Sequence, residues 1–383
     1  MWLARVCSAL VFFAIFFATI YIHSLTWLFA VIVVAIEIGV PLVAIVLSFA
    51  LTGVFILLAH GNPIIVYGSM FRLSFQDGYG FAQVLQKTSQ LIFTGLSVAF
   101  AFRAGLFNIG SEGQLYTGAF VIGLVGMYLG EAPSVVTVPL LILVGILGGA
   151  LWAALPGILK AWVGAHEVIT TIMLNFVAAA LMSYLVSIPQ LHAPGSVHTY
   201  PIPESAQLTP LSTWVGAFRG STASTSLFIA LGAAAFMGWF LWRTRWGYEL
   251  RAVGQNPMAA RTAGISVGRV TIVAMLISGG LAGLVGTDAV MGYKHYFEKD
   301  FSSGIGYLGI AVALLGRNHP VGVVLAAFLF GVLNNGKVAL TGQVSNQIIE
   351  ILQGILILMV VVNTKLFHRY LGRWKRHRMP IKS

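Results

Sequence analysis

The stretch 102–115, FRAGLFNIGSEGQL, concentrates polar side chains in an otherwise apolar region of the sequence. Asn108, Glu112 and Gln114 together supply one carboxylate and two amides within seven positions. Such groups can donate and accept hydrogen bonds from a polar solute, and they can equally satisfy backbone groups at helix ends. The residue types therefore predict either a translocation path for a polar solute or an ordinary capped turn.

The same stretch is expected to interrupt a helix, because glycines break its apolar pattern. Ser111 followed by Gln114 has the spacing of a capping box, and Glu112 then lies in the first turn, where a negative charge suits the helix dipole. We expect one helix to end near Ala104 and another to begin at Ser111, leaving a broken helix near 105–111. Within a membrane such breaks occur where the backbone lines a cavity or is buried by protein.

A second polar position lies in 166–175, HEVITTIMLN, which opens an apolar helix. Asn175 is well inside that predicted span, where a polar side chain faces other helices or a wet path rather than lipid. Its two readings are a residue of the substrate path and a hydrogen bond between helices. Asp288 lies near the end of its own predicted span and is expected at the membrane interface.

The third motif is a short helix within 251–270, RAVGQNPMAARTAGISVGRV. Asn256 can cap a helix, Pro257 suits its first position, and Gly264 suits the residue beyond its end. The resulting helix, Pro257 to Ala263, has about two turns and is too short to be stable alone. A capped helix of small residues favours docking into a groove of a partner, and the alternative is a plain surface link between two spans.

Composition shows which elements must position these groups. The chain has 383 residues, of which 58% are hydrophobic and 9% charged, against about 25% charged in soluble domains. Several apolar stretches are long enough to cross a bilayer core of about 30 Å. We predict an all-α polytopic membrane protein with about ten transmembrane helices, within a range of about nine to eleven. The candidate spans are 7–33, 40–60, 88–103, 112–130, 134–155, 165–188, 225–243, 269–291, 304–317, 320–336 and 345–363.

Charge sets the expected orientation, since the net charge of +11 is concentrated in 243–269 and in the C-terminal tail. Basic segments next to apolar spans indicate the cytoplasmic side and contact with membrane lipid rather than with nucleic acid. The predicted organisation is an N-terminal hydrophobic extension over 1–35, a permease domain over 36–364 and a basic cytoplasmic tail over 365–383. Whether 1–35 spans the membrane stays open.

Glycines four residues apart predict faces where membrane helices pack closely, although this spacing is common in membrane proteins. The pairs are Gly126 and Gly130, Gly145 and Gly149, and Gly279 and Gly283.

Several chemistries are excluded by absent motifs. The sequence has no G-x-x-x-x-G-K-[ST] phosphate loop and no H-E-x-x-H, and its single cysteine, Cys7, excludes an internal disulfide. An ion-coupled secondary transporter is the rival class, which expects mid-span carboxylates, and the candidates are Glu37, Glu112 and Glu350. An intramembrane enzyme would need paired carboxylates or histidines in mid-span, which the sequence does not offer.

The motifs at 105–115, 166–175 and 251–265, with GIGYLGIAVALLG at 304–316, resemble one known family. The chain is similar to permease subunits of bacterial ABC importers in the branched-chain amino acid and monosaccharide permease family. Within that family it looks closest to the nucleoside and simple-sugar branch. The resemblance extends over about 61–363.

This resemblance implies a non-catalytic permease subunit of the inner (plasma) membrane that moves a nucleoside, or a related simple sugar, by alternating access. Its implied partners are one or two ABC ATPase subunits, a second permease subunit in a heterodimer and a substrate-binding protein. ATP would be used by the partner subunit, and this chain would bind no cofactor and no metal. The coupling segment of the family falls on 251–264, and the matching positions are Gly254, Asn256, Ala259, Ala260 and Gly264.

Overall fold

The computed structural model describes residues 43, 45–58, 60–130, 132–339, 350–355 and 358. Contacts between Cα atoms separate the chain into two units. One unit contains the helix Ile45–Leu58 and the helical residues 350–355. The other, Gly61–Ile349, contains every motif discussed below. The predictions for 1–35 and for the tail 365–383 lie outside the described residues.

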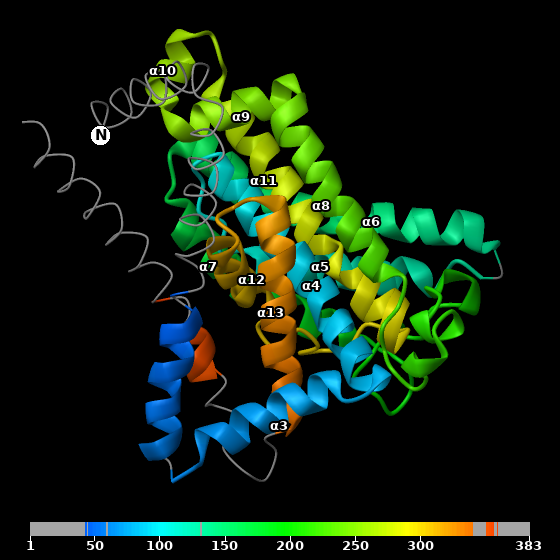
Figure 1. Cartoon of the computed structure of the whole chain (residues 1–383). Helices are drawn as coiled ribbons and strands as arrows, with labels where there is room; N and C mark the ends of the chain where they lie inside the picture. The colour runs from blue at the N-terminus through cyan, green and yellow to red at the C-terminus, as the bar shows by residue number, and fades with distance from the viewer. Residues whose placement is uncertain are drawn as a thin grey trace, which may run out of the picture. The chain divides into compact units, whose positions relative to one another are not determined.

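The Gly61–Ile349 unit is a helical bundle, which confirms the all-α prediction (Figure 1). Within the described residues, pairing of extended backbone is limited to three isolated bridges. The α-helices are α3 (Pro63–Phe75), α4 (Gly78–Arg103), α5 (Ser111–Gly126), α6 (Ser134–Ile158), α7 (Glu167–Val186), α8 (Ser226–Arg243), α9 (Arg245–Gln255), α10 (Pro257–Thr262), α11 (Val267–Gly283), α12 (Ile305–Leu315) and α13 (Pro320–Ala339). Two π-helices, η1 (Leu159–Val163) and η5 (Thr287–Lys294), extend α6 and follow α11, and three short 3₁₀ turns are η2 (Glu204–Ala206), η3 (Leu211–Thr213) and η4 (Gly216–Phe218).

Five helices in the described residues are long and apolar enough to cross a membrane. They are Ser134–Val163, Glu167–Val186, Ser226–Arg243, Val267–Lys294 and Pro320–Lys337. Helices α4 and α5 do not meet that criterion, although they lie in the same bundle. A multi-pass fold is therefore supported, and the count of about ten spans stays a prediction.

Helix α4 does not meet the hydropathy criterion because it carries polar residues, which it can do because protein surrounds it. Every residue from Thr88 to Ala101 is buried, and α4 packs against α8, α11, α12 and α13. A helix enclosed by protein needs no apolar surface for lipid, so it can carry polar residues. It also begins ten residues before the predicted span 88–103, with Asp77 as N-cap accepting a hydrogen bond from the Gly80 amide at 2.7 Å.

Two of the predicted glycine pairs pack against each other where α6 crosses α11. A Cβ atom added at Gly149 would lie 2.2 Å from the carbonyl oxygen of Gly279, and one added at Gly283 would lie 2.1 Å from that of Gly145. The backbones therefore approach as closely as glycine allows. The third predicted pair, Gly126 and Gly130, does not form such a close crossing, because Gly130 has open space around it.

The long segment between α7 and α8 is anchored to the η5 region by backbone hydrogen bonds. The amides of Thr199, Ile202 and Leu208 donate to carbonyls of residues 297, 295 and 291, at 2.9, 2.8 and 2.9 Å. The predicted connection 189–224 is thus an ordered cover of irregular backbone, whose polar groups are satisfied by pairing.

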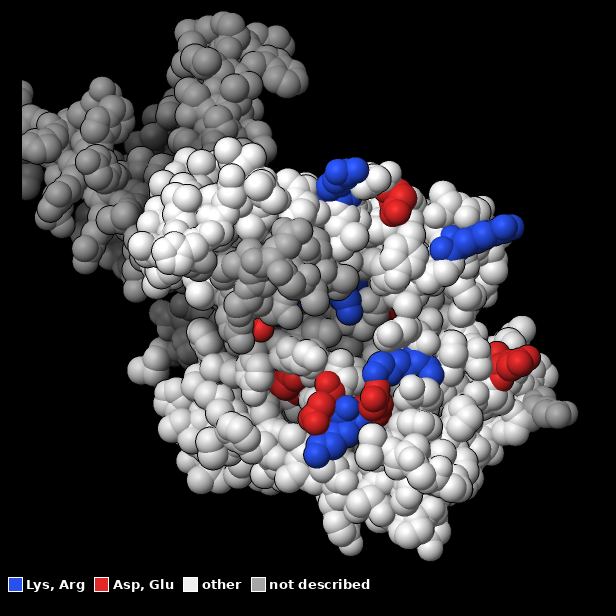
Figure 2. All heavy atoms as spheres, turned by 90° about the horizontal axis from the view of Figure 1, so that it is seen from below, with Lys and Arg blue, Asp and Glu red and all other residues white. Residues whose placement is uncertain are grey.

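The two ends of the bundle differ in charge. At the α10 end the exposed basic residues include Arg243, Arg245, Arg261 and Arg269. The opposite end, seen in Figure 2, carries acidic and basic side chains together around a hollowed centre. This asymmetry agrees with the predicted orientation, in which α10 lies on the cytoplasmic side.

We predict that Gly149→Val destabilises the chain by about 1–3 kcal/mol, because the added side chain must displace the backbone of α11. Thermal unfolding of the purified complex in detergent, followed by size-exclusion chromatography, measures the effect. Gly232→Ala in α8 is the control, since a Cβ there meets nothing within 4 Å. Equal melting temperatures for the two variants would contradict the close crossing.

Candidate functional site

The predicted break between α4 and α5 is present, and side-chain amides satisfy it. Asn108 and Gln114 form a reciprocal amide pair, with N···O distances of 2.9 and 3.0 Å. The Asn108 Oδ1 also accepts from the Gly110 amide at 2.9 Å, and its Nδ2 donates to Ser278 Oγ of α11 at 2.8 Å. The break is therefore held to α11 as well as to the start of α5.

The predicted capping box is wrong. The residue before α5 is Gly110, and no side chain caps the helix. Ser111 instead shares a hydrogen bond of 3.0 Å with Ser97 Oγ of α4, and Gln114 is occupied by Asn108. Tertiary partners at this buried position compete successfully with the local cap.

Asn175 links three elements through one buried amide. Its Oδ1 accepts from the Gly113 amide at 2.8 Å, and its Nδ2 donates to the Ile109 carbonyl at 2.9 Å and to Tyr307 Oη at 3.2 Å. Helix α7 is thereby tied to the break and to α12. The contacts agree with the reading of Asn175 as a hydrogen bond between helices.

Glu112 connects the first turn of α5 to the start of α12. Its carboxylate accepts a hydrogen bond from Ser302 Oγ and another, of 2.7 Å, from the Gly306 amide. Asn108, Glu112, Gln114 and Asn175 are thus all buried and hydrogen-bonded within this one region. Whether any of the four also faces a solute stays a prediction.

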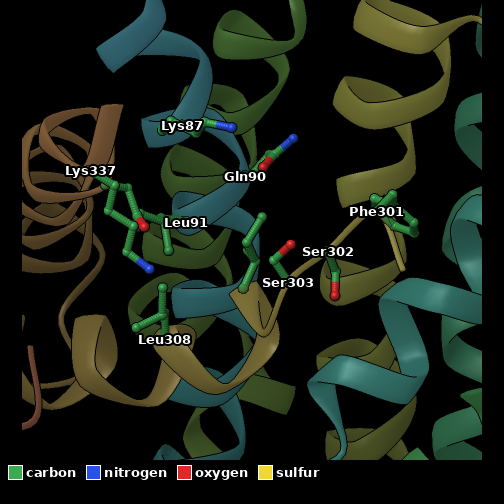
Figure 3. A pocket seen from close by; sticks show the side chains of 10 residues that line it. Lys87, Gln90, Leu91, Phe301, Ser302, Ser303, Leu308 and Lys337 are labelled. Carbon is green, nitrogen blue, oxygen red and sulfur yellow. The ribbon is translucent and has the colours of Figure 1, made fainter. Parts of the chain in front are cut away.

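A cavity of about 240 Å³ lies beside this region, where α4, α13 and residues 301–305 meet (Figure 3). None of the four residues just described lines it, but Ser302, the partner of Glu112, does. Its apolar surface comes from Leu91, Phe301, Ile305 and Leu308, and its polar groups come from Lys87, Gln90, Ser302, Ser303, Asn334 and Lys337. A mostly apolar wall with a few convergent polar groups is typical of a small-molecule site.

Beside the cavity lies a carboxylate, Asp288, which the sequence predicted at the membrane interface. Asp288 is completely buried within the protein, on the π-helix η5, and its depth in the membrane stays a prediction. Gln86 and Gln90 of α4 each donate an Nε2–H to its Oδ2 at 2.7 Å, and Ser226 of α8 donates to its Oδ1 at 2.5 Å. The signal available in the sequence was the pair of glutamines four residues apart, which share one helix face.

Lys87 supplies positive charge to the same cavity. Within the described residues its ammonium has no hydrogen-bond or ion-pair partner, and Figure 3 shows it extending from α4 beside Gln90. No carboxylate of the described residues lines the cavity. The arrangement therefore disfavours a cationic group and suits a solute that offers hydrogen-bond acceptors.

The short helix α10 has the predicted caps. Asn256 Oδ1 accepts from the amides of Met258 and Ala259, both at 3.1 Å, and Pro257 occupies the first position. The helix ends at Thr262, one residue before the predicted end, and Gly264 follows with a φ of +82°.

The coupling positions divide into those that face solvent and those that face the chain itself. Ala259 is exposed, and its neighbour Met258 is 76% exposed, whereas Ala260 is only 4% exposed. A Cβ atom at Gly254 would lie 2.1 Å from the Arg103 carbonyl oxygen, so α9 touches the end of α4 at this residue. Ala260 and Gly254 pack inside the chain, and the coupling role of the whole segment stays a prediction.

Helix α9 was not predicted from the sequence, where residues 244–256 lie between the candidate span 225–243 and the short helix that starts at Pro257. Thr244 caps it by accepting from the Gly247 amide at 3.0 Å. The helix places Gly254 against α4 and leads directly into α10.

No group of three His, Cys, Asp or Glu residues that could hold a metal ion occurs in the part of the chain that the structure describes. Glu298, one acidic residue of the 292–303 connection, is paired with Lys294.

Asn175→Leu is predicted to destabilise the chain by about 2–4 kcal/mol, because it leaves the buried Gly113 amide and Ile109 carbonyl unsatisfied. Tyr307→Phe, which removes one hydrogen bond to the same amide, is the milder control. Thermal unfolding measures the loss, and uptake kinetics separate the two readings. Stability loss with unchanged selectivity supports the helix-linking role, and altered selectivity supports the path.

Sequence comparison identifies the family. A family model described as "branched-chain amino acid transport system / permease component" matches residues 80–361. The guanosine ABC transporter permease protein of Bacillus subtilis is 38% identical over 329 residues, which cover 84% of this chain and 92% of that protein. The nucleoside ABC transporter permease protein of Lactococcus lactis is 36% identical over 331 residues, covering 84% and 90%.

A third relative is the glucose ABC transporter permease protein of Haloferax volcanii, 34% identical over 339 residues, covering 87% of this chain and 89% of that protein. A further guanosine permease of B. subtilis and a further nucleoside permease of L. lactis also match, at 30% and 29% identity. No solved structure matches the chain. The family model and these relatives, together with the apolar helical bundle, show that the chain is a multi-pass membrane protein belonging to the family of branched-chain amino acid transport system permease components.

Proposed function

We propose that this chain is the transmembrane permease subunit of an ABC importer that moves a nucleoside, or a related simple sugar, by alternating access. The observation that carries the proposal is the similarity to guanosine and nucleoside permeases over most of the chain. The glucose permease relative keeps simple sugars within the proposal.

The cavity supports a neutral, hydroxyl-rich solute over an amino acid. Lys87 and Lys337 line it, and no carboxylate of the described part of the chain does, so the ammonium group of an amino acid finds no counter-charge among these residues. The amide and hydroxyl groups of Gln90, Asn334 and Ser303 suit the hydroxyls and ring nitrogens of a nucleoside. We propose that the substrate path passes this cavity.

The break between α4 and α5 then acts as the support of that path. Glu112 holds Ser302, which forms part of the cavity wall, and Asn175 holds the break to α7 and α12. Asn108 and Gln114 keep the break attached to α11 through Ser278. In this proposal Asn108, Glu112, Gln114 and Asn175 shape the substrate path, and they move together when the path opens.

The energy comes from a separate ATPase subunit that docks at α10. This chain lacks a phosphate loop, and its α10 presents Met258 and Ala259 outward. Movement of α10 reaches α4 through the close contact of Gly254 with the Arg103 carbonyl, and α4 carries Lys87 and Gln90 into the cavity. One rigid helix thus connects the docking end to the substrate path.

The remaining partners follow from the importer class. A substrate-binding protein would deliver the solute to the end opposite α10, and the basic α10 end and the C-terminal tail would lie in the cytoplasm of a cell whose inner membrane holds the complex. A second permease subunit is supported by the paired relatives in B. subtilis and L. lactis.

Radiolabelled uptake, measured in cells that carry the complete importer, tests the function. Unlabelled nucleosides are expected to reduce uptake of labelled guanosine at least tenfold when present in large excess, and branched-chain amino acids are expected to leave it unchanged. ATP depletion should abolish uptake. Uptake that survives ATP depletion and collapses with an ionophore would refute the ABC class and favour an ion-coupled transporter.

Met258→Asp is predicted to reduce uptake at least tenfold and to release the ATPase from the purified complex. The exposed side chain would place a charge in the ATPase groove into which α10 docks. Co-purification of the ATPase and its activity in the complex measure the effect. Val197→Asp, at a position 66% exposed in the 189–224 cover, is the matched control. Retained ATPase and normal uptake in Met258→Asp would contradict docking at α10.

A further inference from the structure

The amide of Gln90 is held by a buried carboxylate at one end only. Its Nε2 donates to Asp288 Oδ2 at 2.7 Å, and its Oε1 is buried without a hydrogen-bond partner among the described residues. Gln90 is only 4% exposed and lines the cavity, where Figure 3 shows it between Lys87 and the serines. An unpartnered buried oxygen is rare in native proteins and calls for a partner beyond the described residues.

Asp288 fixes which end of this amide is left without a partner. An amide can rotate to exchange its oxygen and its nitrogen, and hydrogen-bond partners decide between the two orientations. A carboxylate can only accept, so the Nε2–H must point toward Asp288 and the Oε1 must point away. Gln86 Nε2 and Ser226 Oγ hold the carboxylate itself from α4 and α8.

We propose that Gln90 Oε1 is a substrate-recognising acceptor of the transport path and that Asp288 is the residue that positions it. This inference rests on the proposed function and specifies its chemistry. The group that binds Gln90 must donate an N–H or O–H, which a ribose hydroxyl or an N–H of the nucleobase supplies. Lys87, on the same helix, supplies the complementary donor to an acceptor of the same solute.

The π-helix gives this arrangement its geometry. Asp288 lies on η5, where the wider i→i+5 turn replaces the α-helix, and η5 ends at His295 with a φ of +63°. Such π-turns are frequent at functional sites because they reorient side chains within an otherwise regular helix. Here the side chain so placed reaches Gln86 and Gln90 of α4.

The test compares Gln90→Met with Gln86→Met in cells that carry the complete importer. Both glutamines donate to the same Asp288 oxygen from the same helix, but only Gln90 lines the cavity. Uptake efficiency, kcat/KM, is measured for guanosine and for analogues that each lack one donor: inosine and the 2′-, 3′- and 5′-deoxy forms. The binding protein is identical in all strains, so its own selectivity cancels between variants.

Gln90→Met is expected to lower kcat/KM for guanosine about tenfold. It is expected to leave kcat/KM unchanged for one of the analogues that lack a donor, because that analogue never made the hydrogen bond to Gln90. Gln86→Met is expected to change guanosine and all analogues by the same factor. An unchanged guanosine-to-analogue ratio in Gln90→Met, or the same ratio change in Gln86→Met, would overturn the inference.

Asp288→Asn provides the second variant, which keeps the side-chain volume. Its own amide can donate to Gln90 Oε1, so the orientation of Gln90 is no longer imposed. The same analogue preference should be lost, and the double variant with Gln90→Met should lose no more. Normal selectivity in Asp288→Asn, at wild-type protein levels in the membrane, would remove the positioning role.

Failure of the wider proposal is separable from failure of this one. If the unaltered importer takes up no nucleoside, the nucleoside assignment fails, and the same variants are then compared with glucose and its single-deoxy forms. A loss of glucose uptake in Gln90→Met that one single-deoxy form escapes supports the acceptor role of Gln90, and equal effects across the glucose panel, or no uptake of either class, overturn it.

Discussion

A helix that is interrupted inside a protein, out of reach of bulk water, leaves backbone N–H and C=O groups without helical partners. These groups must find partners inside the protein, and this bundle is organised around that constraint. The break lies between α4 and α5. Side-chain amides bond the backbone groups there, which are the Ile109 carbonyl and the amides of Gly110 and Gly113. Asn175 supplies two of these partners and Asn108 the third. Each amide reaches a different neighbouring helix, so the hydrogen bonds that satisfy the break also bring α7, α11 and α12 around it.

Helix α4 ends at this break and gives the molecule its continuity. One end touches Gly254 of α9, close to the proposed docking helix, and the middle carries Lys87 and Gln90 into the cavity. Because a helix is stiff over this length, displacement at one end is transmitted to the other. The close glycine crossing of α6 and α11 is a second rigid contact, and together they leave few ways for the bundle to move except by concerted shifts.

Polar residues of α4 explain why its start was predicted incorrectly from the sequence. Hydropathy reads Gln83, Gln86, Lys87 and Gln90 as the end of a connection, so the predicted span began at 88 rather than at Gly78. Helix α9 was missed for a related reason, since its charged sequence resembles a loop. The caps of α10, by contrast, depend only on residues within the helix and its flanks, and Asn256, Pro257 and Gly264 predicted them correctly.

By itself, the sequence determined the class of the protein, its helical content, the site of the break and the short capped helix, because apolar length, glycine placement and end caps are local properties. Only the tertiary structure decided what the polar groups contact. Ser111 bonds Ser97 rather than capping α5, and Asp288 is buried and bonded to residues of α4 and α8. Residues up to about 200 positions apart meet in these contacts, and no local pattern specifies such partners, since they depend on how the helices pack.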